Sequence, residues 1–181
     1  MKINFFQTSF WIDEINAVVD VMKTWMIAEW ETVKKLENDF NNFITKWNYF
    51  SIAVTSGTTA LDLALKAFAI KDNDEVIVPD FTFIATANAV RFQNAKVVFA
   101  DVDMQNYNID FEDIKSKITP NTKAIIVVHL FGNPISNITE IANFCKKRWI
   151  KLIEDCAQAH WAMVNNKVVW SFWDASCFSF Y

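Results

Sequence analysis

Glycine is unusually scarce in this sequence. Two of the 181 residues are glycine, whereas eight are tryptophan. Average usage of about 7% would give roughly a dozen glycines in a chain of this length. Turns need residues that adopt positive φ without strain, and glycine does so more readily than any other residue. A chain with many turns is not expected to be this poor in glycine.

Other absences exclude several classes of protein. Charged residues make up 21% of the chain and hydrophobic residues 52%, a balance that indicates a folded rather than a disordered protein. The net charge is -4 and no basic run is present, which argues against nucleic acid or an anionic membrane surface as the main partner. Apolar runs such as residues 124–128 have the length of a strand, far short of the roughly 20 residues that span a membrane.

Cysteine usage and the N-terminus favour a cytoplasmic protein. The three cysteines, Cys145, Cys156 and Cys177, are odd in number and lack metal-ligand spacing, which fits a reducing compartment. The first residues, 1–4, lack the apolar segment of a secretion signal. We therefore expect a reduced cytoplasmic protein without a metal site.

Hydrophobic periodicity predicts strands that alternate with helices. Helices are expected over residues 12–23, 31–43, 58–68, 83–92 and 138–147, and strands over residues 51–55, 75–78, 96–99, 123–128 and 151–153. The strands are continuous apolar runs, which indicates an α/β fold with a mainly parallel sheet and helices on both faces. We expect a helical N-terminal segment over residues 1–49 and an α/β core over residues 50–181. Residues 177–181 have the pattern of a strand that nothing follows, so we expect a fold that is incomplete at the C-terminus.

A glycine and several hydroxyl side chains occupy residues 55–59, between a predicted strand and a predicted helix. The amide groups and the dipole at a helix N-terminus make an anion site there. The alternative is simple capping of the helix by Ser56 or Thr58. The segment is not a nucleotide-binding P-loop, because the GxxxxGK[ST] pattern is absent.

Two further segments follow strands at the sheet edge where ligands of α/β proteins gather. Asp155 follows the strand over residues 151–153, and a carboxylate there can keep a pyridinium nitrogen protonated. Its alternative role is to cap a following helix, and for His160 we favour a structural hydrogen bond. In residues 79–83, an aromatic side chain such as Phe83 can stack on a planar cofactor or belong to the core.

Together these segments resemble the nucleotide-sugar aminotransferase family often named after DegT, a branch of the fold-type-I pyridoxal-phosphate enzymes. The resemblance covers nearly the whole chain and is carried by residues 26–29, 53–58, 74–79, 81–86, 107–110, 128–132, 154–160 and 177–181. It implies the large domain of the aspartate aminotransferase type, with active sites shared across a homodimer. Residues 1–181 would be the N-terminal part of that domain, and the small C-terminal domain would be absent.

The resemblance also implies a reaction and six cofactor-binding residues. The reaction is transfer of an amino group, normally from glutamate, to a keto group of a nucleotide-linked sugar, with the strongest local resemblance to enzymes acting on 4-keto-6-deoxy sugars. The cofactor is pyridoxal 5'-phosphate. The six implied residues are Gly57 and Thr58 in the phosphate cup, Ser179 at the phosphate, Phe83 stacked on the ring, Asp155 at the ring nitrogen and Gln158 near the ring hydroxyl.

The sequence departs from the family pattern at the catalytic lysine. In the family this lysine forms the Schiff base and follows the Phe-Ser-Phe-Tyr segment within a few residues, whereas the sequence ends at Tyr181. We therefore expect the Schiff-base lysine just beyond Tyr181 and predict that the fragment alone is inactive. Two alternatives stay open: a pyridoxamine-phosphate-dependent sugar dehydratase, which has histidine in place of the lysine, and a non-catalytic carbohydrate-binding module built on a tryptophan-rich surface.

The second departure is the tryptophan content. The family usually has glycine where this chain has Trp25, Trp30, Trp161, Trp170 and Trp173, and glycine would also be natural at Trp11, Trp47 and Trp149. The eight tryptophans, added to the two glycines, would give ten glycines and an ordinary composition. We hypothesise that UGA codons, read as glycine in the source organism, were translated as tryptophan. The alternative is that the indoles are genuine and form stacking surfaces for sugars.

Overall fold

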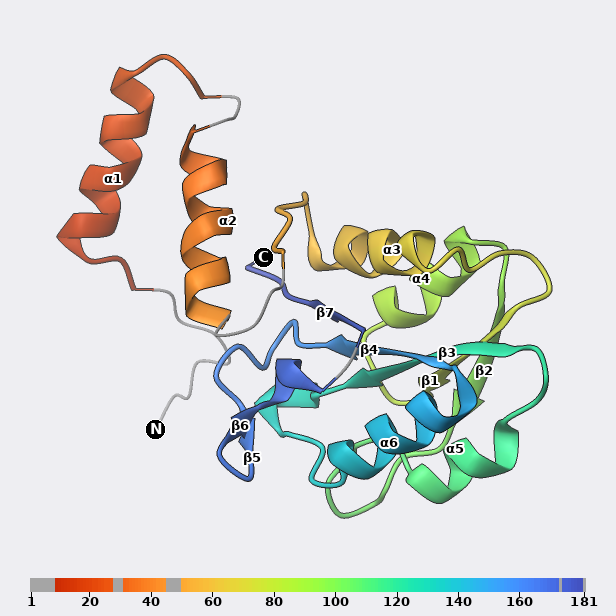
Figure 1. The fold of residues 1–181 in the computed structure, drawn as a ribbon. Coiled ribbons are helices and arrows are strands. Elements are labelled where there is room, and N and C mark those ends of the chain that lie inside the picture. The colour runs from red at the N-terminus through yellow and green to blue at the C-terminus, as the bar shows by residue number, and fades with distance from the viewer. Residues whose placement is uncertain (1–8, 28–30, 45–49, 173, 181) are drawn as a thin grey trace. The chain divides into compact units, whose positions relative to one another are not determined.

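The computed structural model describes four stretches of the chain, residues 9–27, 31–44, 50–172 and 174–180. By its internal contacts the chain divides into two compact units, Met1–Ala53 and Val54–Tyr181. The first unit contains two helices, α1 (Ile12–Lys23) and α2 (Glu31–Ile44) (Figure 1). Both helices were predicted from their periodicity.

Charge placement stabilises both ends of α1. Asp13 and Glu14 lie in its first turn and Lys23 in its last, where each sign of charge complements the helix dipole. The Glu14 carboxylate also accepts a hydrogen bond from the Trp11 backbone N–H at the helix start. No residue of α1 is buried, and Ile15 on its apolar face is 48% exposed.

The second unit is built on a five-stranded parallel sheet, which confirms the predicted α/β class. The strand order is β2-β1-β3-β4-β7, and all four neighbouring pairs are parallel. The strands are β1 (Glu75–Pro79), β2 (Lys96–Ala100), β3 (Thr122–Val128), β4 (Lys151–Asp155) and β7 (Ala175–Cys177). Parallel strands have their carboxyl ends at the same edge of a sheet, so the loops that leave β1, β3, β4 and β7 meet at that edge.

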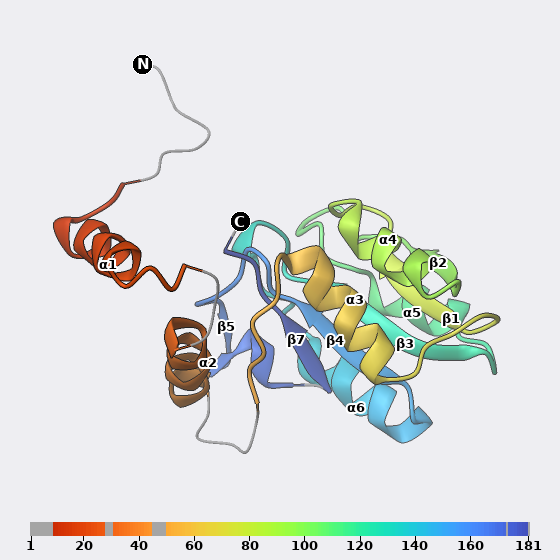
Figure 2. The same cartoon turned by 90° about the horizontal axis from the view of Figure 1, so that it is seen from above.

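Helices cover both faces of this sheet, as parallel strands require. The helices are α3 (Gly57–Ala67), α4 (Ala85–Phe92), α5 (Phe111–Lys117) and α6 (Ile138–Arg148). α3 and α4 lie on one face, and α5 and α6 lie on the other (Figures 1 and 2). The remaining elements are the 3-10 turns η1 (Leu130–Gly132) and η2 (Val169–Ser171) and the antiparallel strands β5 (Met163–Val164) and β6 (Lys167–Val168).

Alternation along the strands divides the core into two layers. Val76 and Val78 belong to one buried cluster with Leu65 of α3. Ile77 and Ile125 are also fully buried, and because side chains alternate along a strand, Ile77 points to the opposite face. Burying one side chain of this size contributes roughly 1.5–3 kcal/mol. The two layers thus bury the sheet on both faces.

One predicted strand is wrong, and the strand expected at the C-terminus is shifted, because it ends at Cys177 as β7. Residues 51–55 form no strand, and Ile52 is 68% exposed. No described strand pairs with this segment, so its backbone groups have no ladder to join. Residues 178–180 also lie outside a strand, because β4 ends at Asp155, the residue that pairs with Cys177, and offers no partner beyond it. Tyr181 lies outside the described residues.

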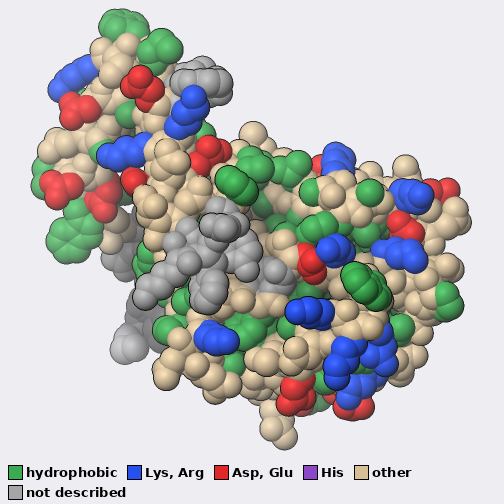
Figure 3. Space-filling model, viewed as in Figure 1, with side chains coloured by type: hydrophobic (Ala, Val, Ile, Leu, Met, Phe, Trp, Pro, Cys, Tyr) green, Lys and Arg blue, Asp and Glu red, His purple; other side chains and the backbone are tan. Residues whose placement is uncertain are grey.

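None of the described helices combines the length and the apolar character needed to cross a membrane. On the face of the molecule in Figure 3, acidic and basic side chains are mixed with hydrophobic ones. The basic residues in the last turn of α6, Lys146, Lys147 and Arg148, lie where they complement the negative end of the helix dipole.

Two tryptophans have the backbone conformation that favours glycine. Trp25 and Trp149 both have φ of 60°, and their side chains are 88% and 93% exposed. Trp149 is the C-cap of α6, and its N–H donates to the carbonyls of Cys145 and Lys146. Glycine is the usual residue in a left-handed helix cap. The backbone therefore fits glycine better than tryptophan at these two positions.

The other described tryptophans differ from one another in burial. Trp11 and Trp161 are each 73% exposed, without positive φ. Trp170 is buried, and its indole N–H donates to the His160 carbonyl at 3.1 Å. Three others lie outside the described residues, Trp30, Trp47 and Trp173. The glycine hypothesis stays a prediction, with its physical support at Trp25 and Trp149.

We expect Trp149→Gly to raise the free energy of unfolding of the full-length protein by about 1 kcal/mol, because a left-handed backbone costs a non-glycine residue roughly 1–2 kcal/mol. The exposed indole contributes little burial that would be lost. Urea denaturation measures the difference. Trp161→Gly is the matched control, since it removes an exposed indole from a residue without positive φ and is expected to bring no gain. Equal effects of the two substitutions would contradict the backbone explanation.

Candidate active site

The predicted site residues lie at strand ends, at a helix start and in loops around the carboxyl edge of the sheet. Phe83 follows β1, Asp155 is the last residue of β4, and Ser179 follows β7. A backbone hydrogen bond of 2.7 Å from the Cys156 N–H to the Cys177 carbonyl joins the ends of β4 and β7. The topology therefore gathers at one edge residues that are far apart in the sequence.

Gly57 and Ser179 are in direct contact. A Cβ added to Gly57 would lie 2.9 Å from Ser179 Cβ, 3.4 Å from Ser179 Oγ and 3.5 Å from the Phe178 carbonyl oxygen. A carbon–carbon approach of 2.9 Å is well inside the optimal separation of roughly 3.5–4.0 Å. Only glycine fits at position 57 without displacing Ser179. Two residues predicted from separate segments are thus side by side.

The N-terminus of α3 offers amide donors beside Ser179. Ser56 is the N-cap, and its Oγ accepts the Thr59 N–H at 3.2 Å. Gly57 and Thr58, the first two residues of the helix, have no acceptor within the helix for their own N–H groups. The positive end of the helix dipole adds to their attraction for an anion. Capping by Ser56 and an anion cradle at Gly57 and Thr58 are therefore compatible.

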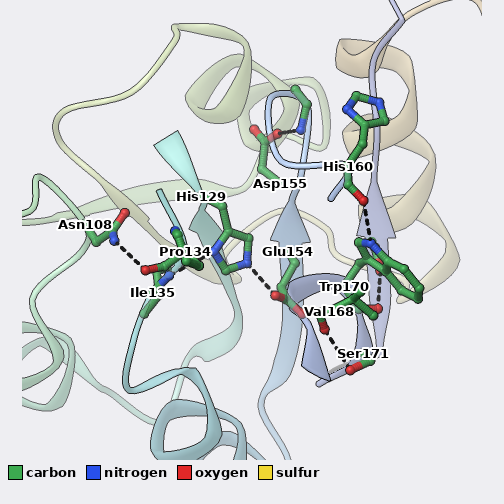
Figure 4. A network of polar contacts seen from close by, with 12 residues as sticks. Asn108, His129, Pro134, Ile135, Glu154, Asp155, His160, Val168, Trp170 and Ser171 are labelled. Atoms are coloured by element: carbon green, nitrogen blue, oxygen red, sulfur yellow. Dashed lines mark hydrogen bonds and ion pairs between the residues drawn. The ribbon is translucent and has the colours of Figure 1, made fainter. Parts of the chain in front are cut away.

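The buried carboxylate of Asp155 accepts hydrogen bonds from two donors. Its Oδ2 accepts the Thr86 hydroxyl at 3.1 Å. Its Oδ1 accepts the Ala157 N–H at 3.1 Å (Figure 4). Burial raises the pKa of Asp155, and these two hydrogen bonds oppose that rise. A cationic N–H placed against the carboxylate would favour its ionised form. The alternative that Asp155 caps a helix is wrong, because residues 156–160 form turns.

Phe83 is an exposed aromatic ring at the entrance to α4. It is 72% exposed, so the alternative that it belongs to the core is wrong. Its carbonyl accepts the Thr86 N–H at 3.1 Å, and the hydroxyl of Thr86 is the group that donates to Asp155. The backbone of Phe83 is therefore linked to the Asp155 carboxylate through Thr86. A flat apolar ring in this place can cover one face of a planar ligand.

Gln158 is fixed by the loop that follows β3. Its Oε1 accepts the Phe131 backbone N–H at 2.8 Å. Phe131 has φ of 55° and Gly132 has φ of 77°, and a Cβ on Gly132 would lie 3.0 Å from the Gln158 carbonyl oxygen. Because the Phe131 N–H can only donate, the atom it meets is the amide oxygen of Gln158. The amide nitrogen of Gln158 is left to donate elsewhere.

His160 is packed among aromatic rings next to Ser179. Its ring centroid lies 5.5 Å from that of Phe178 and 4.9 Å from that of Phe180. Burial lowers the pKa of His160, and a hydrogen bond to the Ser179 backbone opposes that change. The packing fits the structural role favoured for His160 from the sequence, which stays a prediction.

A buried histidine–glutamate pair was not predicted. His129 follows β3 and Glu154 lies within β4; both side chains are 0% exposed, and His129 Nε2 lies 2.5 Å from Glu154 Oε2. Burial lowers the pKa of His129 to about 4 and raises that of Glu154. Cys156 Sγ, a ring nitrogen of His129 and a carboxylate oxygen of Glu154 all lie within 4.8 Å of one another. The direct contact of the histidine nitrogen with the glutamate oxygen leaves no space for an ion between those two atoms. The sequence feature that could have indicated this pair is a glutamate within a predicted buried strand.

The arrangement suits a flat cofactor with a phosphate at one end and a basic ring nitrogen at the other. The close contact of Gly57 with Ser179 places two helix N-terminal amides beside a hydroxyl, a combination of donors that suits a phosphate group. Asp155 is a carboxylate that gains from a cationic partner. Pyridoxal phosphate has both groups, and the α/β fold is that of the fold-type-I pyridoxal-phosphate enzymes.

Residues 11–181 match the DegT/DnrJ/EryC1/StrS aminotransferase family, and the chain belongs to this family. Its members are pyridoxal-phosphate enzymes, which establishes the cofactor class. The chain is 38% identical over 169 residues to GDP-perosamine synthase of Escherichia coli O157:H7, an alignment that covers 92% of this chain and 44% of the relative.

Solved structures give the same picture. The chain is similar to an aminotransferase from Psychrobacter cryohalolentis, with a TM-score of 0.89 and 37% identity over 95% of this chain and 43% of the other. It is also similar to the GDP-4-keto-6-deoxy-D-mannose-3-dehydratase of E. coli with bound hydrated PLP, with a TM-score of 0.83 and 34% identity over 92% of this chain and 44% of the other. The sequence thus spans less than half the length of these proteins.

Proposed function

We propose that the full-length protein transfers an amino group from glutamate to the keto group of a nucleotide-linked 4-keto-6-deoxy sugar, with pyridoxal phosphate as cofactor. Membership of an aminotransferase family supports the reaction class, and similarity to GDP-perosamine synthase supports a nucleotide-linked sugar as substrate. The observation that carries the proposal is the contact of Gly57 with Ser179 at the N-terminus of α3.

In this proposal one group of residues holds the phosphate. Gly57 and Thr58 donate their backbone N–H groups to the phosphate oxygens, and the Ser179 hydroxyl donates a further hydrogen bond. Amides that are already oriented by a helix require no reorganisation when the anion arrives. Charge-assisted hydrogen bonds of this kind contribute roughly 1.5–3 kcal/mol each.

A second group of residues controls the ring. Asp155 keeps a proton on the ring nitrogen, Phe83 covers one face and excludes water, and Gln158 donates a hydrogen bond to the ring oxygen. When bound, pyridoxal phosphate supplies an electron sink for the carbon that loses its proton. The proton on the ring nitrogen, held by Asp155, increases this electron withdrawal. The lysine that moves the proton is expected just beyond Tyr181, so the segment alone is proposed to be inactive.

The proposal includes a cytoplasmic homodimer. All three cysteines are free and buried, which suits a reducing compartment. Phe83 and Phe131, both at the site edge, are 72% and 69% exposed. Apolar surface of this kind is normally covered, and a partner subunit together with the rest of the chain would cover it.

An absorption spectrum of the full-length protein with pyridoxal phosphate tests this proposal. An aminotransferase gives the visible band of lysine-bound cofactor, and added glutamate removes that band while 2-oxoglutarate forms. A dehydratase, the alternative favoured by the similarity to the E. coli enzyme, gives no lysine band, and its sugar substrate loses a hydroxyl group. A carbohydrate-binding module would leave the cofactor spectrum unchanged. Either of the last two results would overturn the proposed amino transfer.

A further inference from the structure

The buried pair of His129 and Glu154 lies next to Asp155 at the carboxyl ends of β3 and β4. His129 is the residue after β3, and Glu154 is the chain neighbour of Asp155 in β4. The His129 backbone N–H donates to the Asp155 carbonyl at 3.2 Å, and the two side chains meet at 2.5 Å (Figure 4). The proposed function gives neither residue a part.

The contacts of His129 define which of its nitrogens carries the proton. The Ile135 backbone N–H donates to Nδ1 of His129 at 3.2 Å. A backbone amide can only donate, so Nδ1 has a free lone pair and the ring proton is on Nε2. Nε2 therefore donates to Glu154 Oε2. Burial, which lowers the pKa of His129 to about 4, keeps this ring neutral at neutral pH.

Glu154 completes the pair from within the sheet. Its Oε1 is buried and has no hydrogen-bond partner among the described residues. A lone ionised oxygen in this environment is costly, and burial raises the pKa of Glu154. The other titratable groups around the pair are Asp155 and Cys156, whose thiol pKa is also raised by burial. No cation faces the pair among these groups, so burial shifts both side chains toward their neutral forms.

Two hydrogen bonds join His129 to later residues of the loop over residues 129–135. The His129 carbonyl accepts the Gly132 N–H at 3.2 Å, and Nδ1 accepts the Ile135 N–H. Asn108 adds a third contact, from its Nδ2 to the Pro134 carbonyl at 3.3 Å (Figure 4). The same loop carries the Phe131 N–H that occupies Oε1 of Gln158.

We propose that His129 is a positioning residue: its Nδ1 fixes the 129–135 loop, so that the Phe131 N–H occupies Gln158 Oε1 and leaves Gln158 to serve the cofactor as a hydrogen-bond donor. Glu154 holds the proton on Nε2 and so keeps Nδ1 an acceptor. The donor role of Gln158 toward the cofactor rests on the proposed function, whereas the fixing of the loop does not.

The first test is the tautomer of His129 in the wild-type full-length protein. A nitrogen-15 NMR spectrum that resolves the two ring nitrogens is expected to show a protonated Nε2 and an unprotonated Nδ1, unchanged between pH 5.5 and pH 8. A proton on Nδ1, or a ring that titrates near its ordinary pKa of 6.5, would overturn the proposal. This measurement needs neither cofactor nor substrate, so failure of the proposed amino transfer would leave it intact.

The second test compares two substitutions, each of which keeps the hydrogen bond made by one of the two imidazole nitrogens. The amide oxygen of His129→Asn reaches about as far as Nδ1 and can still accept the Ile135 N–H. The amide nitrogen of His129→Gln reaches about as far as Nε2 and keeps only the contact to Glu154. We expect hydrogen exchange at the Phe131 amide to accelerate about tenfold in His129→Gln, the loss of roughly one hydrogen bond, and to stay near wild type in His129→Asn.

The cofactor provides a readout of a different kind. In His129→Gln, the pH at which the visible band of bound pyridoxal phosphate titrates is expected to shift, because Gln158 is no longer oriented as a donor. Glu154→Gln is the control: it keeps an acceptor for Nε2 and is expected to change neither the Phe131 exchange rate nor the titration. Wild-type exchange and titration in a folded His129→Gln would overturn the proposal. If His129→Gln does not fold, a folded His129→Asn with rapid Phe131 exchange would overturn it, and slow exchange there would support it.

Discussion

Gly57→Ala is expected to weaken the binding of pyridoxal phosphate to the full-length protein by about 10–100-fold, equivalent to roughly 1.4–2.7 kcal/mol. The added Cβ would lie 2.9 Å from Ser179 Cβ and 3.4 Å from its hydroxyl. Overpacking of this kind costs roughly 1–3 kcal/mol, and relaxation would move Ser179 away from the phosphate. Fluorescence or absorption titration with the cofactor measures the affinity.

Ser179→Gly provides the matched background for this test. It removes the Cβ that the new methyl group would meet, and the next neighbour, the Phe178 carbonyl oxygen, is at 3.5 Å and tolerates the contact. Gly57→Ala is therefore expected to cost clearly less in the Ser179→Gly protein than in the wild type, as a double-mutant cycle would show. Additive losses in the cycle would mean that Gly57 is needed for another reason, and the steric explanation would be wrong.

Asp155→Asn is expected to reduce kcat by about 100-fold or more, the scale of loss when a preorganised charge at a reacting system is removed. The isosteric amide can still meet the ring nitrogen but cannot keep it protonated, so the cofactor would withdraw electrons less strongly. Steady-state kinetics with glutamate and the keto sugar measure the change. Thr86→Val is the graded control: it removes one hydrogen bond of 3.1 Å to Asp155 and is expected to cost about tenfold or less. Wild-type kcat in Asp155→Asn would contradict the assignment.

Asp155→Asn, which is expected to reduce kcat, is expected to increase the stability of the cofactor-free protein. Burial raises the pKa of Asp155 above its ordinary value of 3.8. The folded state therefore holds this proton at pH values where the unfolded state has lost it, and stability falls as pH rises from about 4 toward the raised pKa. An amide side chain has no such proton to lose, so Asp155→Asn is expected to gain stability relative to wild type over this range. Urea denaturation from pH 4 to pH 8 measures the difference, and a constant difference would contradict a raised pKa.

Much of the α/β core could be predicted from local patterns. Within the predicted strands, residues 76–78 and 124–128 are apolar at every position, a pattern that indicates strands covered on both faces. Their observed counterparts are the central strands β1 and β3. The family resemblance added the residues at the sheet edge that are predicted to bind the cofactor. Local pattern was sufficient where burial on both faces decides the structure.

The local sequence pattern did not predict the structure correctly where strand pairing or helix capping determines it. Residues 51–55 have the composition of a strand, yet a strand requires a neighbour that the sequence pattern does not reveal. The short helix α5 was missed because seven residues give too little periodicity. Its signal is the N-cap, where the Asp110 side chain accepts the Asp113 N–H at 2.9 Å.

Two parts of the site depend on register and could not be predicted. His129 meets Glu154 only because β3 and β4 are aligned with Val128 opposite Asp155. The hydrogen bond from Thr86 to Asp155 joins residues 69 positions apart. No local spacing encodes either contact, whereas Gly57 and Asp155 stand at strand–helix and strand–loop junctions that the sequence marks.

The most direct test of the central claim is the fate of the nitrogen atom of glutamate. The full-length protein would be incubated with pyridoxal phosphate, nitrogen-15-labelled glutamate and a nucleotide-linked 4-keto-6-deoxy sugar, and the products analysed by mass spectrometry. We expect the label in an amino group on the sugar, with one 2-oxoglutarate formed for each amino sugar. A sugar that loses a hydroxyl group without gaining the label, or that is recovered unchanged by cofactor-loaded protein, would contradict the account.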